Sequence, residues 1–225
     1  TSIYGISLQK KSREIKTKSI PENILKWLHN EVSQSKGKAV SKDYYINDFN
    51  KVIGYIKGYD KRAGFSSGII YFENDLTGED LPTTVRIYED GRFECSFLAI
   101  HPISSWIFFN NQIIDFYAAP GTVTGIILNW DEFLLADRYR DRPYEFKDVQ
   151  YLGTNQTTNE TLASIRFSLP DYRKLDEFRK KQRPQDFKNM QLEKWKNARK
   201  AADSIISATN VPENIKKMSV NQIDL

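Results

Sequence analysis

Apolar side chains recur at every second position in short runs between residues 68 and 169, a spacing typical of β-strands. Turn segments such as NDLTGED, HPISS and GTNQTTN separate the runs. Because the intervals are too short for crossover helices, most neighbouring strands should be antiparallel. The predicted strands are GIIYFE, TTVRIYE, RFECSFLAI, SWIFF, IIDFYA, TVTGIILNW, EFKDVQYL and TLASIRFSL.

The clearest of these patterns predicts a β-hairpin over residues 83–97. Asp90-Gly91 supplies the positive φ that a tight hairpin turn requires. Alternation places one set of side chains inward and the other outward, without a nucleophile beside a base. The inward set is Val85, Ile87, Phe93, Cys95 and Phe97, and the outward set is Arg86, Tyr88, Arg92 and Glu94.

The segment before this region carries helical spacing. Residues 19–32 predict a first helix, with Ser19 and Glu22 spaced as in a capping box and a proline in the first turn. Residues 44–59 fit either a helix or a strand interrupted by glycines. We favour the helix, because its apolar positions follow the helical period.

Two further helices are predicted after the strands. The first begins after Pro170, with Asp171 as its N-cap, and Pro184 ends it. The second runs from about residue 185 to 208 and has one apolar stripe. The stripe consists of Phe187, Met190 or Gln191, Trp195, Ala198, Ala202 and Ile205.

These elements predict an α+β fold with a central, mainly antiparallel sheet of six to eight strands. An N-terminal helix and a C-terminal helical pair flank the sheet. We expect residues 1–169 to form the helix-plus-sheet domain, residues 170–208 the basic helical pair packed on it, and residues 209–225 a tail.

The composition of this 225-residue chain bears on whether it crosses a membrane and on its cellular compartment. With 28% charged residues and no long apolar run, no membrane-spanning segment is expected, and the first residues do not resemble a secretory signal. The single cysteine favours a reducing compartment, so we expect a cytoplasmic protein. Asn155 and Asn159 match the glycosylation sequon, but we expect neither to be used. The many Lys, Asn and Ile residues suggest a bacterial or mobile-element origin.

Positive charge is concentrated near the end of the chain. Residues 171–200 contain eleven Lys or Arg against five acids, a net charge of +6 in a chain of net +4, so the remainder carries −2. A basic helical face can neutralise phosphates or meet an acidic protein surface. The candidate contact residues are Arg173, Lys174, Arg179, Lys180, Lys181, Arg183, Lys188, Lys196, Arg199 and Lys200. The leading hypothesis is therefore a non-enzymatic protein that binds nucleic acid or an acidic protein partner.

A second hypothesis comes from the acidic stretch at residues 131–147. Asp137, followed after a gap by Glu145-Phe146-Lys147, resembles the catalytic pattern of the PD-(D/E)xK nucleases. The resemblance implies that Asp137 and Glu145 hold Mg²⁺, that Lys147 stabilises the attacking water or developing charge, and that Glu145 and Lys147 lie on one face of a strand. The alternating charges of DRYRDR can equally pair with one another on a solvated edge strand or loop. A third hypothesis is a protein that assembles with copies of itself.

Other chemistry is excluded or disfavoured. His29, His101 and Cys95 cannot build a structural zinc site of the usual spacing. Neither a phosphate-binding P-loop nor a nucleophile elbow occurs, so no cofactor is expected, with Mg²⁺ as the alternative if the chain is a nuclease. Most aromatic residues should be core, although YY at 44–45 and WIFF at 106–109 can offer stacking platforms to single-stranded nucleic acid.

Overall fold

The computed structural model describes residues 19–39, 41, 43–74, 77–138, 144–164 and 172–208. The helices are α1 (Glu22–Val32), the short 3₁₀ helix η1 (Lys61–Ala63), α2 (Trp130–Arg138), α3 (Gln156–Ser164), α4 (Tyr172–Lys181) and α5 (Pro184–Ala208). The strands are β1 (Asp48–Lys57), β2 (Ser67–Tyr71), β3 (Glu73–Asn74), β4 (Glu79–Asp80), β5 (Thr83–Ile87), β6 (Arg92–Ala99), β7 (Ile103–Phe109), β8 (Gln112–Ala118), β9 (Val123–Asn129) and β10 (Gln150–Leu152).

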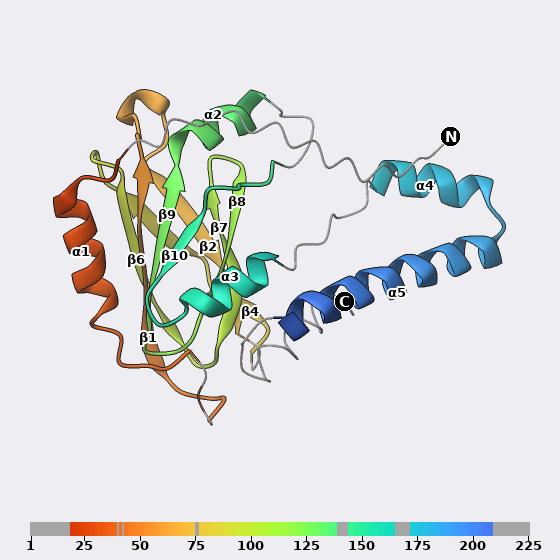
Figure 1. Ribbon diagram of the computed structural model, residues 1–225, viewed down its shortest axis with the longest axis horizontal. Coiled ribbons are helices and arrows are strands. Elements are labelled where there is room, and N and C mark those ends of the chain that lie inside the picture. The colour runs from red at the N-terminus through yellow and green to blue at the C-terminus, as the bar shows by residue number, and fades with distance from the viewer. Residues whose placement is uncertain are drawn as a thin grey trace.

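Eight strands form one curled sheet in the order β10-β9-β1-β6-β5-β2-β7-β8 (Figure 1). Every pairing in it is antiparallel except that of β1 with β9. This confirms the predicted α+β fold, its mainly antiparallel sheet, its N-terminal helix and its C-terminal helices. The parallel pair matters for the site below, because the ends of β1 and β9 lie side by side, with Lys57 opposite Asn129.

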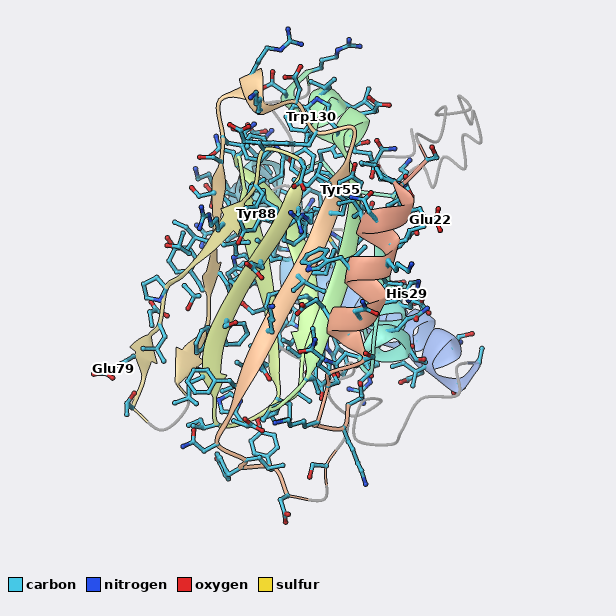
Figure 2. The ribbon with its side chains drawn as sticks, turned by 90° about the vertical axis from the view of Figure 1, so that its left-hand side faces the viewer. Glu22, His29, Tyr55, Glu79, Tyr88 and Trp130 are labelled. Atoms are coloured by element: carbon cyan, nitrogen blue, oxygen red, sulfur yellow. The ribbon has the colours of Figure 1, made fainter. Side chains whose placement is uncertain are left out.

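The curled sheet encloses most of the core. Side chains such as Phe93, Phe109 and Ile114 are fully buried in its main hydrophobic cluster. A smaller cluster lies on the outer face, where Ile24 and Leu28 of α1 pack against strands β1 and β9. Figure 2 shows α1 lying along that outer face beside β1. The amphipathic helix therefore covers the part of the sheet where β1 has apolar residues on both faces.

Side chains of α3 and β10 bind the backbone of the edge strand β8. Asn159 accepts a hydrogen bond from the backbone N–H of Tyr117 on β8 (2.7 Å) and donates to the carbonyl of the same residue (3.0 Å). Tyr151 of β10, at the opposite edge, donates its hydroxyl proton to the carbonyl of Asp115 on β8 (2.8 Å). Backbone groups of the edge strand β8 thus gain partners, which limits pairing with other chains.

The predicted hairpin is confirmed, and its turn is built on Gly91. Gly91 has a φ of 89°, and the backbone N–H of Tyr88 donates to the carbonyl of Arg92 across the turn (2.7 Å). All five predicted inward side chains are buried. The hairpin is structural, because its inward side chains, including the thiol of Cys95, are packed in the core.

The prediction of a helix over residues 44–59 is wrong, because residues 48–57 form the strand β1. This strand lies between β6 and β9 and is buried on both faces from Val52 to Lys57. A strand buried on both sides has no apolar alternation, so its sequence can imitate the helical period. Within this strand only glycine fits at position 54, since a Cβ there would lie 2.1 Å from the carbonyl oxygen of Ile126.

Three smaller expectations are also wrong. Part of TLASIRFSL, predicted as a strand, belongs to helix α3, which also includes residues predicted as a turn. The strand predicted over EFKDVQYL is confined to β10. Helix α1 begins at Glu22 with Pro21 as its N-cap, and no side chain caps it, so Ser19 and Glu22 form no capping box.

The C-terminal helical pair extends to one side of the sheet (Figure 1). Helix α5 begins at Pro184, whose missing N–H costs nothing at a first helical position. The predicted N-cap Asp171 and the predicted tail 209–225 lie outside the described residues. Within the described part of the chain, no helix is long and apolar enough to cross a membrane.

Candidate functional site

The basic residues predicted to bind a partner lie on α4, on α5 and on the turn between them. Their side chains point into solvent rather than into the core, apart from that of Arg199, which is partly buried. The exposed residues are Arg179, Lys180, Lys181, Arg183, Lys188, Lys196 and Lys200. Arg173 and Lys174 lie within α4, but the structure describes only their backbone and not their side chains.

Four of these cations have an acid of the same helical pair as a neighbour. Asp176 contacts both Arg179 and Lys180 at 2.8 Å, and Asp186 contacts Arg183 at 2.8 Å. Arg199 lies 3.8 Å from Asp203. Hydrogen bonds from Lys180, and from Arg179, hold the pKa of Asp176 below its usual value. All these pairs are three or four residues apart and solvent-exposed, so they stabilise the helices little and yield readily to a competing anion.

Four other lysines have no ion pair within the part of the chain that the structure describes. They are Lys181, Lys188, Lys196 and Lys200. Three of them lie on the single rigid helix α5, and two of these, Lys196 and Lys200, are one helical turn apart. The local acids therefore neutralise only part of the basic surface.

Glu145 and Lys147, the residues of the nuclease-like pattern, do not lie on the predicted strand. Glu145 and Lys147 belong to an extended segment that precedes β10, not to a strand. Both side chains are exposed and Phe146 between them is buried, so the expected alternation is kept. Asp137 is exposed in the last turn of α2.

Glu132, a residue that the sequence did not single out, holds this segment in place. Its carboxylate is buried on α2 and accepts hydrogen bonds from the backbone N–H groups of Lys147 (2.8 Å) and Asp148 (2.9 Å). The Tyr144 hydroxyl adds a third (3.3 Å). A carboxylate committed to three donors of its own chain acts as a structural anchor.

Asp148 and Lys57 form a second anchor at the ends of the parallel strands. The Lys57 ammonium, at the end of β1, lies 2.7 Å from the Asp148 carboxylate, with side-chain exposures of 4% and 24%. Asn129 of β9 donates to the same oxygen (3.1 Å), and Gln150 donates to the other (3.4 Å). Burial raises the pKa of Asp148, but these donors outweigh burial and hold the pKa below its usual value. Sequence reasoning missed this pair, because residues 44–59 were predicted as a helix, and Lys57 meets Asp148 only when β1 is a strand.

No family model, curated protein or solved structure matches this chain. Within the described ranges, no group of three or more His, Cys, Asp or Glu forms a potential metal site. The nuclease hypothesis keeps Asp137 and Glu145 as its two carboxylates and stays a prediction.

Cys95, His101 and the two sequon asparagines are engaged in the fold. Cys95 is buried on β6, and burial raises the pKa of its thiol to about 12, so it is not a nucleophile. His101 is buried beside the ring of Tyr44, and its Nδ1 lies 2.8 Å from the carbonyl oxygen of Pro102. The sequon residues Asn155 and Asn159 are buried and hydrogen-bonded, so neither is open to glycosylation in the folded protein.

One hollow of about 310 Å³ lies between the loops at residues 36–48 and 119–120. Its charged lining consists of Lys36, Lys38, Asp43 and Asp48. Among the described residues that line this hollow, two cations and two acids balance, so they give no net attraction for a polyanion. The helical pair is the stronger candidate for a charged partner.

Proposed function

We propose that this protein is a non-enzymatic binding protein that engages a polyanion through α4 and α5. Nucleic acid is the first candidate partner and an acidic protein surface the second. The supporting observation is a set of four exposed lysines that form no ion pair with any residue the structure describes, Lys181, Lys188, Lys196 and Lys200. They lie on helices that extend to one side of the sheet (Figure 1).

Physical chemistry favours a polyanion over a single small anion. Exposed lysines spread along a helix neutralise several phosphates at once, and each neutralised phosphate releases counterions into the solution. The paired cations Arg179, Lys180 and Arg183 can join such a contact, because a polyanion displaces an exposed local acid at little cost. Binding by this surface should therefore weaken steeply as salt rises.

The test compares two triple variants with the same change in net charge. The first replaces Lys188, Lys196 and Lys200 of α5 with glutamine. The second replaces Lys26, Lys36 and Lys38, three exposed lysines outside the helical pair. Affinity for nucleic acid and for poly-L-glutamate is measured over a salt series.

For nucleic acid, the α5 variant should lose about three units from the slope of log K against log salt, since each contact contributes roughly one. The control variant should keep the wild-type slope. Equal losses in both variants would mean that net charge alone attracts the ligand, and the proposal would fail. Tight binding to poly-L-glutamate but not to nucleic acid would identify an acidic protein as the partner.

The Mg²⁺-dependent nuclease remains a second proposal, favoured by the exposure of Glu145 and Lys147 on either side of the buried Phe146. Here the ion would supply charge stabilisation to a phosphodiester bond under attack by water. Cleavage that requires Mg²⁺ and disappears in Glu145→Ala would support it. If Glu145→Ala keeps its salt-dependent binding and the wild type cleaves nothing, the nuclease proposal fails and only the binding proposal remains. Light scattering on the same samples tests the third hypothesis, self-assembly.

A further inference from the structure

Four side chains on α5 form a straight row of mixed character. Lys188, Leu192, Trp195 and Arg199 are spaced by four, three and four residues, so they lie along one face of the helix. The row spans about 16 Å at 1.5 Å per residue. A cation stands at each end and two apolar side chains stand between them.

The two apolar side chains of this row are open to solvent. Leu192 is 44% exposed and Trp195 is 41% exposed, although burial of such side chains is strongly favourable. The guanidinium of Arg199 lies 6.0 Å from the centre of the Trp195 ring. Lys196 and Lys200 follow the last two members of the row directly in sequence and border it. The indole thus has one cation beside its ring, Arg199, and other basic residues nearby on the same helix.

We propose that this row binds single-stranded nucleic acid, with the Trp195 ring stacked on a base and Lys188, Arg199 and the bordering lysines on the phosphates. This inference rests on the proposed function and names its ligand class. Interleaved cations and aromatic faces are how proteins bind single strands without sequence preference. The cations hold the backbone, and the aromatic ring offers a surface to any base.

A duplex uses this row less well. Its bases are stacked on one another, so an exposed indole and leucine meet only sugars and phosphates, and the lysines alone contribute. An acidic protein partner also leaves the indole without a matching aromatic surface. The composition of the row therefore distinguishes a single strand from the other polyanions.

The test uses two tryptophans of nearly equal exposure. Trp195 on α5 is 41% exposed and Trp106 on β7 is 44% exposed, so alanine at either position removes a similar surface. Affinity of wild type, Trp195→Ala, Trp195→Phe and Trp106→Ala is measured for a single-stranded oligonucleotide and for a duplex of the same length. Far-UV circular dichroism confirms that each variant is folded.

We expect wild type to prefer the single strand. Trp195→Ala should weaken that binding by about 5- to 150-fold, the range for a base-stacking aromatic residue. The salt slope should not change, Trp195→Phe should recover most of the affinity, and Trp106→Ala should bind as wild type does. Fluorescence quenching on binding should be smaller in Trp195→Phe than in wild type.

Each other outcome has a distinct meaning. Equal affinity for single strand and duplex, with no effect of Trp195→Ala, would overturn this inference and leave the proposed function standing. A loss in Trp106→Ala alone would move the stacking surface to the sheet and also overturn it. Absence of salt-dependent binding to either nucleic acid would remove the proposed function together with the inference.

Discussion

The ion pair of Lys57 with Asp148 should respond asymmetrically when either partner is replaced. The Lys57 ammonium has a side-chain exposure of only 4%, and Asp148 is its hydrogen-bond acceptor. The Asp148 carboxylate is 24% exposed and retains Asn129 and Gln150 as donors when the lysine is lost. Replacing Asp148 therefore leaves the buried Lys57 ammonium without its acid, whereas replacing Lys57 leaves no buried charge without a partner.

The expected magnitudes follow from this difference in surroundings. Asp148→Asn keeps the shape of the side chain and removes its charge, so it should lower the free energy of unfolding by about 3 kcal/mol, as for a buried pair that loses one partner. Lys57→Met keeps the apolar stem and should cost about 1 kcal/mol, the value of one hydrogen bond. The double variant should resemble Lys57→Met, because no charge is then left without a partner.

Urea denaturation followed by circular dichroism measures these free energies, provided that the slope with denaturant stays constant. Glu89→Gln is the control, since its pair with Lys61 is exposed and 3.1 Å long, and it should leave the free energy of unfolding unchanged within error. The reasoning is refuted if Lys57→Met costs as much as Asp148→Asn, or if Asp148→Asn behaves like the control.

Lowering the pH should narrow the difference in the free energy of unfolding between wild type and Asp148→Asn. The pKa of Asp148 is lowered in the folded protein, so the folded state binds the proton less tightly than the unfolded state. The stability that the carboxylate contributes is present above its unfolded pKa of about 4. It is lost as the pH falls through the lower folded value. The two unfolding free energies should therefore converge in that acid range.

Two further predictions concern the interior. Cys95, whose pKa burial raises to about 12, should resist a disulfide reagent in the native protein at pH 8 and react in urea; prompt native labelling would contradict its burial. Asn159→Ala should lower the free energy of unfolding by about 2 kcal/mol, because it leaves the backbone N–H of Tyr117 without its acceptor. Gln156→Ala, at an exposed position of the same helix, is the matched control, and equal losses in both variants would show that Asn159 does not anchor α3 to β8.

The sequence predicted best where one face of a strand is buried and the other is not. The hairpin of β5 and β6 alternates throughout, so the order of residues alone was enough to name its inward side chains. Strand β1 lacks that signal, because α1 covers one of its faces and the core covers the other. Its pattern of apolar residues cannot distinguish strand from helix, and the close approach of Gly54 to Ile126 shows only in the fold.

The polar anchors were harder to predict, because they join residues far apart in the chain. Lys57 and Asp148 meet only when β1 and β9 lie in parallel and the segment before β10 returns to their ends. Glu132 reads as an ordinary acid in the first turn of a helix, and nothing local indicates that two backbone N–H groups will bind it. The basic surface, in contrast, is a property of local composition and is plain in the sequence.

The two kinds of ion pair in this molecule separate its stability from its proposed binding. In the sheet domain, Lys51 of β1 contacts Glu31 of α1 (2.8 Å) and Glu94 of β6 (3.2 Å), so the charges join elements distant in sequence. In the ion pairs described on α4 and α5, each acid is no more than four residues from its cation, so those pairs join no distant parts of the chain. Loss of charge in the sheet domain should therefore unfold the protein more readily. Loss of charge on the helical pair should leave the fold intact and remove the partner, so the proposed binding surface can be changed without disturbing the body that carries it.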